Sequence, residues 1–149
     1  MIRACVLVGL LAALVGTAAA SAPARIHWRT DETAALAEAR RSGRPILVDA
    51  WADWCAGCKL LDRNTWSDSR VRDEVHAQFV PLRLDVSSEG SAAEVRVRAL
   101  DVSALPAVLV CSPRGCDPAA PRSVGYLGAT EMLAFLRQAR TQPPSHGSR

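Results

Sequence analysis

Apolar and polar positions follow two different periods along the chain, and each change of period marks a new element. Residues 44–52 (RPILVDAWA) are apolar almost without interruption, which is typical of a strand buried on both faces of a sheet. Pro106 begins another apolar run, at the strand position where a missing N–H is tolerated. Strands are predicted over residues 25–28, 44–52, 79–87, 106–111 and 122–128, the last antiparallel to the one before it.

Helical periodicity fills the segments between these strands. The first helix carries the expected terminal signals, with Thr30 or Asp31 as its cap and Gly43 at its end. Helices are predicted over residues 30–43, 58–66, 67–79, 91–102 and 130–140. The resulting order, β-α-β-α-α-β-α-β-β-α, predicts an α/β fold with a central mixed β-sheet flanked by helices on both faces.

The two ends of the sequence differ from the domain between them. A positive start, an apolar run over residues 6–15 and the A-x-A pattern at 18–20 predict a cleaved signal peptide, residues 1–20. The run is shorter than the ~20 residues that span a bilayer, although an uncleaved anchor remains an alternative. We therefore expect one domain over residues 21–140, a disordered polar tail over 141–149, and a periplasmic or secreted location without a membrane span.

Composition narrows the class of protein. Apolar residues make up 49% and charged residues 22% of the chain, an ordinary globular mixture. The net charge of +3 is too small to indicate a nucleic-acid partner. We expect a monomer that binds no nucleic acid.

Cysteines carry the candidate chemistry. Cys5 lies in the signal peptide, and the remaining even number in an exported chain predicts two disulfides. Cys111 ends a predicted strand and Cys116 follows the turn at 112–115, so a structural disulfide at the base of a hairpin is the favoured interpretation of this pair. A second redox pair and two free thiols remain alternatives.

Cys55 and Cys58 lie between a buried strand and the start of a helix. Free backbone N–H groups and the helix dipole at that position favour a thiolate on Cys55. Cys58 follows one turn later, within reach of a mixed disulfide formed by Cys55. We expect Cys55 to attack and Cys58 to resolve.

Two acids accompany this pair. Asp49 interrupts the apolar strand, and its burial would raise its pKa and let it exchange a proton with the resolving thiol. An Asp solvated at the end of the strand is the alternative. Asp62, four residues after Cys58 on the same helix face, is a second candidate, unless it is an ordinary exposed helix acid. Asp53 and Lys59, which flank the motif, can each be surface charge alone.

The segment VDAWADWCAGCK (48–59) resembles the active-site segment of the thioredoxin superfamily: a buried acid, a tryptophan, then W-C-x-x-C-K. LPAVLV (105–110) and VGYLGATEMLAFL (124–136) resemble the family's cis-proline strand, final strand and last helix. Within the superfamily the chain is most similar to the C-terminal periplasmic domain of the thiol:disulfide interchange protein DsbD. The acid after the second cysteine, NTWSDSRV (64–71) and the Leu-Pro pair carry that likeness.

The resemblance implies a thioredoxin fold and an exported thiol:disulfide oxidoreductase, acting as a protein-disulfide reductase or an electron relay. It implies no cofactor other than the redox-active disulfide Cys55–Cys58, and proton handling by Asp49, with Asp62 as the second candidate. It also implies a cis peptide bond before Pro106, which places Leu105 beside the Cys55 sulfur to pair with substrate. The substrate-binding residues it implies are Trp54, Ala56, Gly57 and Leu105.

The implied partners are protein disulfides and a membrane or soluble electron donor, because this sequence lacks the membrane domain of DsbD. A different class of function is a structural zinc site. All four cysteines of the two pairs have legal ligand spacings, but 52 residues separate the pairs, and His27 and His76 show no ligand spacing. No Met-rich or His-rich tract supports copper handling. Nearby negative charge raises a thiol pKa, so the acids around the pair favour a reducing couple over a strong oxidant.

Overall fold

The computed structural model describes residues 25–141, so the predictions for residues 1–20 and for most of the tail lie outside the described part. One sheet contains all the strands of that part, in the spatial order β2-β1-β3-β4. The strands are β1 (Ile46–Trp51), β2 (Val80–Asp85), β3 (Ala107–Cys111) and β4 (Arg122–Val124). The helices are α1 (Glu32–Ser42), α2 (Ala56–Asn64), α3 (Ser69–Gln78), α4 (Ala92–Ala99) and α5 (Ala129–Thr141).

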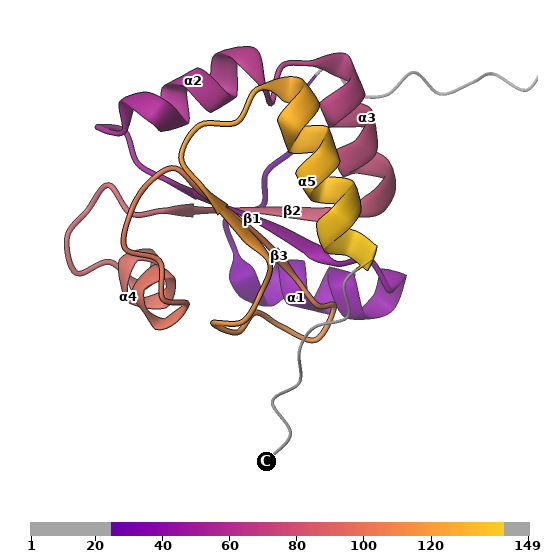
Figure 1. Cartoon of the computed structure of the whole chain (residues 1–149). Coiled ribbons are helices and arrows are strands. Elements are labelled where there is room, and N and C mark those ends of the chain that lie inside the picture. Colours follow the sequence, from indigo (N-terminus) through magenta and orange to yellow (C-terminus); the bar gives the residue numbers. More distant parts are fainter. Residues whose placement is uncertain (1–24, 142–149) are drawn as a thin grey trace, which may run out of the picture.

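The sheet is mixed, as the sequence predicts. β1 runs parallel to β2 and antiparallel to β3, and β3 is antiparallel to β4. Figure 1 shows α1 and α4 on one side of the sheet, with α2, α3 and α5 on the other. None of the helices within residues 25–141 is long and apolar enough to cross a membrane.

Alternate residues of the central strand β1 enter two different cores, which explains its nearly continuous apolar sequence. Ile46, Val48 and Ala50 pack in the cluster that includes the buried residues of α1 and α4. Leu47 packs in the cluster formed by α2, α3 and α5. The period of two places Asp49 on the same face as Leu47, toward α2. Burial of this strand on both faces is therefore confirmed.

Two predicted strands are wrong in extent. Residues 25–28 form no strand: only Arg29 makes an isolated parallel bridge, to Leu82 of β2. The segment before α1 is too short for a regular edge strand, because Asp31 already caps the helix. The strand predicted over 122–128 ends at Val124, because Gly125 adopts a φ of 96° and turns the chain while its N–H donates to the Pro106 carbonyl.

Helix boundaries follow their caps. Asp31 accepts a hydrogen bond from the N–H of Ala34, and Gly43 closes α1 in the left-handed conformation, as predicted. α4 is shorter than the predicted range 91–102, because Asp101 takes a φ of 58° just after the helix. The chain then passes along residues 101–105 toward the active-site proline.

Candidate active site

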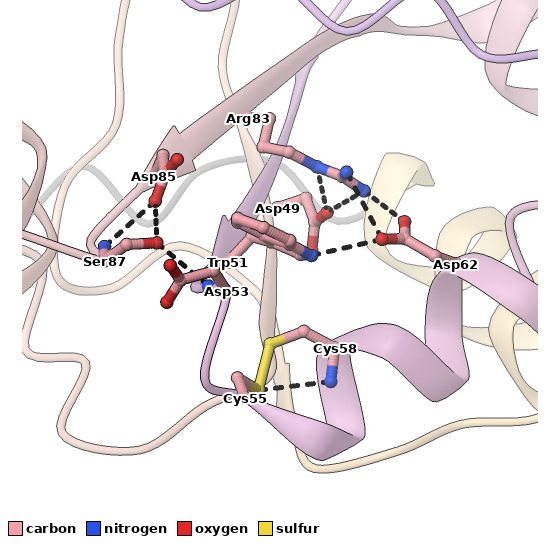
Figure 2. Close-up of a disulfide and its surroundings, with 9 residues drawn as sticks. All are labelled: Asp49, Trp51, Asp53, Cys55, Cys58, Asp62, Arg83, Asp85 and Ser87. Atoms are coloured by element: carbon pink, nitrogen blue, oxygen red, sulfur yellow. Dashed lines mark hydrogen bonds and ion pairs between the residues drawn. A yellow bond between two sulfur atoms is a disulfide. The ribbon is translucent and has the colours of Figure 1, made fainter.

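Cys55 ends the turn after β1 and serves as the N-cap of α2. Its Sγ accepts a hydrogen bond from the N–H of Cys58 at 3.1 Å, and the two sulfurs form a disulfide (Figure 2). α2 thus begins at Ala56, two residues earlier than predicted, because the cysteine itself caps it. The N–H groups of a first helical turn stabilise negative charge, so a thiolate on Cys55 is favoured at this position once the disulfide is reduced.

Asp49 lies beneath the motif on β1 and is 1% exposed, so the alternative of a solvated strand-end acid is wrong. Burial raises the pKa of Asp49 from 3.8 to about 6, although the Arg83 guanidinium opposes the rise and Asp62 adds to it. Asp49 Oδ1 has no hydrogen-bond partner among the described residues. A buried carboxyl with a pKa near neutrality and one unoccupied oxygen is suited to take up and return a proton.

Sequence reasoning missed Arg83. Its Nη2 lies 2.7 Å from Asp49 Oδ2 and 2.6 Å from Asp62 Oδ1, so one guanidinium joins both acids. The parallel register of β1 and β2 pairs Asp49 directly with Arg83. An arginine that interrupts the apolar run at 79–87, just as Asp49 interrupts its own strand, was the signal available in the sequence.

Tryptophans enclose this ion cluster. The Arg83 guanidinium carbon lies 4.8 Å from the centre of the Trp28 ring and 5.5 Å from that of Trp51. Trp51 Nε1 also donates to Asp62 Oδ2 at 3.1 Å. Figure 2 shows the disulfide next to this cluster, with α2 carrying both Cys58 and Asp62. Asp62 is therefore a partly buried, ion-paired group and not an ordinary exposed helix acid.

A second, smaller set of polar contacts fixes the turn before Cys55. The N–H of Asp53 donates to Ser87 Oγ at 2.9 Å, and the Ser87 hydroxyl and N–H both donate to Asp85 (Figure 2). These bonds tie the turn to the end of β2. Asp53 and Lys59 are exposed, which is consistent with their interpretation as surface charge.

The predicted proline lies beside the motif. The Leu105–Pro106 peptide bond is cis, as the resemblance implies. A Cβ atom added to Gly57 would lie 2.7 Å from Pro106 Cδ, so the two residues already touch. Leu105 packs against the cluster that contains Cys55 and Cys58. Trp54, 65% exposed, and Leu105 line a cleft of about 620 Å³ next to the disulfide, while Ala56 is exposed at its helix end.

Cys111 and Cys116 form the second disulfide, at the other end of the sheet. Cys111 pairs with Ile46, the first residue of β1, whereas Cys55 follows the last residue of that strand. At ~3.3 Å per residue the length of β1 separates the two pairs by far more than one coordination sphere. A zinc site of four cysteines is therefore wrong. Within residues 25–141, no group of three or more His, Cys, Asp or Glu side chains gathers to hold a metal ion.

Comparisons with known proteins agree with this geometry. Residues 27–113 match the thioredoxin-like family. The chain belongs to this family. In overall fold it is similar to a thioredoxin from Thermus thermophilus, with a TM-score of 0.67, 24% identity, and coverage of 83% of this chain and 95% of that one. The oxidised C-terminal domain of DsbD from Neisseria meningitidis gives a TM-score of 0.63 at 21% identity, covering 76% of this chain and 99% of that domain.

Sequence relatives are thiol:disulfide interchange proteins. The chain is 34% identical over 109 residues to DsbD 1 of Pseudomonas aeruginosa, covering 73% of this chain and 18% of the relative. It is 35% identical over 103 residues to DsbD of Citrobacter koseri, covering 69% of this chain and 18% of that protein. The chain thus spans less than a fifth of the length of these relatives.

The thioredoxin-like family and the thioredoxin fold, and with them the predicted fold and resemblance, are confirmed. A C-x-x-C disulfide at a helix N-terminus is the arrangement that thiol–disulfide exchange uses, so the geometry agrees with the predicted enzyme class. Oxidoreductases of this fold exchange electrons through the sulfurs of the pair and need no cofactor.

Replacing Asp49 by asparagine is expected to stabilise the protein at pH 8. The folded carboxyl, with its pKa raised from 3.8 to about 6, holds its proton more tightly than the unfolded chain, so wild-type stability falls as the pH rises between those values. The shift corresponds to at most about 3 kcal/mol. We expect D49N to gain about 1–3 kcal/mol in unfolding free energy at pH 8, measured by urea denaturation, and little at pH 4. Asp53→Asn, at an exposed site, is the control. An equal gain at both pH values would contradict the assigned burial cost.

Replacing Gly57 by alanine is expected to destabilise the oxidised protein, even though alanine favours helix by about 1 kcal/mol. The new Cβ would overlap the Pro106 ring, and overpacking of this kind costs about 1–3 kcal/mol. We expect a net loss in unfolding free energy and slower disulfide exchange, measured by thermal denaturation and turnover. Arg63→Ala, at an exposed position of the same helix, should match wild type. A G57A variant as stable and active as R63A would show that the contact is not limiting.

Proposed function

We propose that the protein is an exported reductase or electron relay for disulfides in other proteins. The single observation that carries this proposal is the position of Cys55 Sγ, which caps α2 and accepts the N–H of Cys58. Cys58 and Asp49 are both buried. The names of the DsbD relatives support interchange of disulfides as the reaction. A cleft of about 620 Å³, lined by Trp54 next to Cys55 and by Leu105 next to Pro106, supports a protein as the substrate.

Each half-reaction balances within the two cysteines. In the reduced protein the Cys55 thiolate attacks one sulfur of the substrate disulfide, forming a mixed disulfide and expelling the other substrate sulfur as a thiolate, which takes up a proton. Cys58 gives its proton to Asp49 and attacks Cys55 Sγ, which breaks the mixed disulfide and expels the second substrate sulfur as a thiolate that takes up a proton. The substrate leaves as a dithiol, and Cys55–Cys58 is oxidised by two electrons. A dithiol donor, membrane-bound or soluble, reverses these steps to restore the reduced pair.

The remaining site residues act on the substrate chain. In this proposal the Leu105 backbone, held next to the disulfide by Pro106, pairs with the extended chain on one side of the scissile sulfur. Trp54, Ala56 and Gly57 form the surface on the other side. The exposure of Trp54 and Ala56 and the contact between Gly57 and Pro106 support this arrangement.

The environment of the pair favours a reducing couple. Asp49 and Asp62 place negative charge near the sulfurs, and a single Arg83 offsets only part of it. Excess negative charge disfavours the thiolate. A disulfide is a strong oxidant when its reduced, thiolate-bearing form is stabilised, so this charge favours a reducing couple. The signal pattern of residues 1–20 supports export. The monomeric state and the division of the chain into signal, domain and tail remain predictions from the sequence.

The Cys58→Ser variant is expected to accumulate mixed disulfides with its substrates. The serine cannot attack Cys55 Sγ, so the intermediate persists and is visible as a higher-mass species on a non-reducing gel. Cys55→Ser removes the attacking sulfur and is the matched control. Equal trapping by both variants, or none by C58S, would count against the assigned roles.

The reduction potential of Cys55–Cys58 is expected to lie near that of thioredoxin, about −270 mV. Equilibration with glutathione buffers, followed by quantification of the two redox forms, measures it. The Cys111→Ala/Cys116→Ala variant serves as the control that attributes the signal to the active-site pair. A value near about −120 mV, typical of a strong periplasmic oxidant, would overturn the proposed direction of electron flow.

A further inference from the structure

The outer wall of the active-site cleft is a stretch of chain with little regular structure. Residues 101–105 line the cleft together with Trp54 and residues of α4, and they lead directly into Pro106. Asp101, Ser103 and Ala104 are exposed in this stretch. Contacts between residues 101–105 and the rest of the fold therefore determine the position of this wall.

Arg122 supplies side-chain hydrogen bonds at the start of this wall, beside the backbone bonds from Asp101 and Val102 to α4. Its Nη1 donates to the carbonyls of Leu100 at 2.7 Å and Asp101 at 3.1 Å, at the C-terminal end of α4. A cation that donates to the last carbonyls of a helix satisfies them and interacts favourably with the helix dipole. Arg122 thus holds the point where α4 ends and the cleft wall begins.

The same guanidinium also holds the loop that follows β3. Arg122 Nη2 donates to the carbonyl of Pro118, and Nε donates to that of Ala120 at 3.4 Å. One side chain therefore connects residues 118–120 with the end of α4. The position of the α4 end then depends on where this loop lies.

The Cys111–Cys116 disulfide fixes the start of this loop. Cys111 is 2% exposed and belongs to the core shared by α1 and α4, so the bond anchors the loop to the sheet. On α4, Arg96 donates to the Cys116 carbonyl at 3.3 Å while its Nε pairs with Glu32 of α1 at 2.7 Å. The loop is thus joined to α4 at both of its ends, through Arg96 and through Arg122.

We propose that Arg122, supported by the Cys111–Cys116 disulfide, is a positioning residue for the substrate cleft. The effect on substrate recognition rests on the proposed function. It touches no reacting atom. It fixes the end of α4 and hence residues 101–105, which form the wall against which a substrate chain lies beside Cys55. Loss of this contact is expected to weaken recognition of a protein substrate while leaving the exchange chemistry of the sulfurs intact.

The test compares Arg122→Met with Arg114→Met in the full chain. Arg114 lies in the same loop, is exposed, and makes no side-chain hydrogen bond with the described residues, so it controls for loss of an arginine from this region. Hydrogen exchange is measured for the amides of residues 100–105. We expect R122M to accelerate this exchange by about tenfold or more, and R114M to leave it unchanged.

Kinetics give the second readout. Reduction of insulin with dithiothreitol as electron donor is compared with the single-turnover reaction of the reduced protein, freed of dithiothreitol, with the small disulfide dithiobis(nitrobenzoic acid). We expect R122M to raise KM for insulin by about threefold to tenfold with kcat unchanged, and to react with the small disulfide at the wild-type rate, because only the large substrate uses the wall. Arg122→Lys, which retains a donor, should recover part of the loss. The C111A/C116A variant should move both readouts in the same direction as R122M, and it replaces R122M if that variant does not fold.

The outcomes separate the two proposals. Equal exchange and equal insulin kinetics in R122M and R114M would overturn the positioning role. A rise in KM accompanied by an equal loss with the small disulfide would also overturn it, because the defect would then lie at the sulfurs. A wild-type protein that reduces neither substrate would refute the proposed function, while the exchange comparison would still decide whether Arg122 holds residues 100–105.

Discussion

The contact between Arg83 and the buried Asp49 constrains the rest of the structure. A carboxylate that is 1% exposed on a central strand is tolerated only with a partner, because an unpaired buried charge costs several kcal/mol. The partner comes from β2, so the parallel register of β1 and β2 must place Arg83 beside Asp49 and no other residue. A shift of register by one residue would move the guanidinium to the opposite face of the sheet. The proposed proton exchange by Asp49 thus requires this register of β1 and β2. The apolar clusters on both faces of the sheet require the same register.

This arrangement balances reactivity against stability. Arg83 also pairs with Asp62 on α2, so the helix that carries Cys58 is joined to the strand that carries Asp49. Burial raises the pKa of Asp49 by more than the Arg83 guanidinium lowers it, and the Asp62 charge adds to the rise, so the pKa remains about 6. In the proposed mechanism Asp49 accepts the Cys58 proton: a carboxylate whose charge was fully offset by cations would be a poor acceptor near neutral pH, and one without any cationic partner would stay protonated. The incomplete compensation keeps the group close to its useful range.

The sequence predicts those parts of the molecule that local patterns encode. The cap at Asp31, the continuous apolar strand around Asp49 and the cysteine pair at a helix mouth are all confirmed, since each depends on neighbours within a few residues. The edges of the sheet are not local. The composition of residues 25–28 is typical of a strand, but in this region only Arg29 forms a β-bridge, to Leu82 of β2. Arg83 and Arg122 were missed for the same reason, because their acceptors are distant in sequence and are brought close only by strand register and loop path.

The different positions of the two disulfides support the proposal that one is reactive and the other structural. Attack on a disulfide is favoured when the expelled sulfur can hold negative charge. At the active site, attack on Cys55 expels the buried Cys58, and in the proposed mechanism Asp49 returns a proton to that sulfur so that it need not stay charged. At the other end of the sheet, attack on the more exposed Cys116 would expel Cys111 as a thiolate into the apolar core of α1 and α4, where burying a charge is costly. In the proposed function the same bond type exchanges at one end of β1 and holds the fold at the other. A cycle that repeatedly opens Cys55–Cys58 can leave the loop of Arg122, and with it the wall of the cleft, in place.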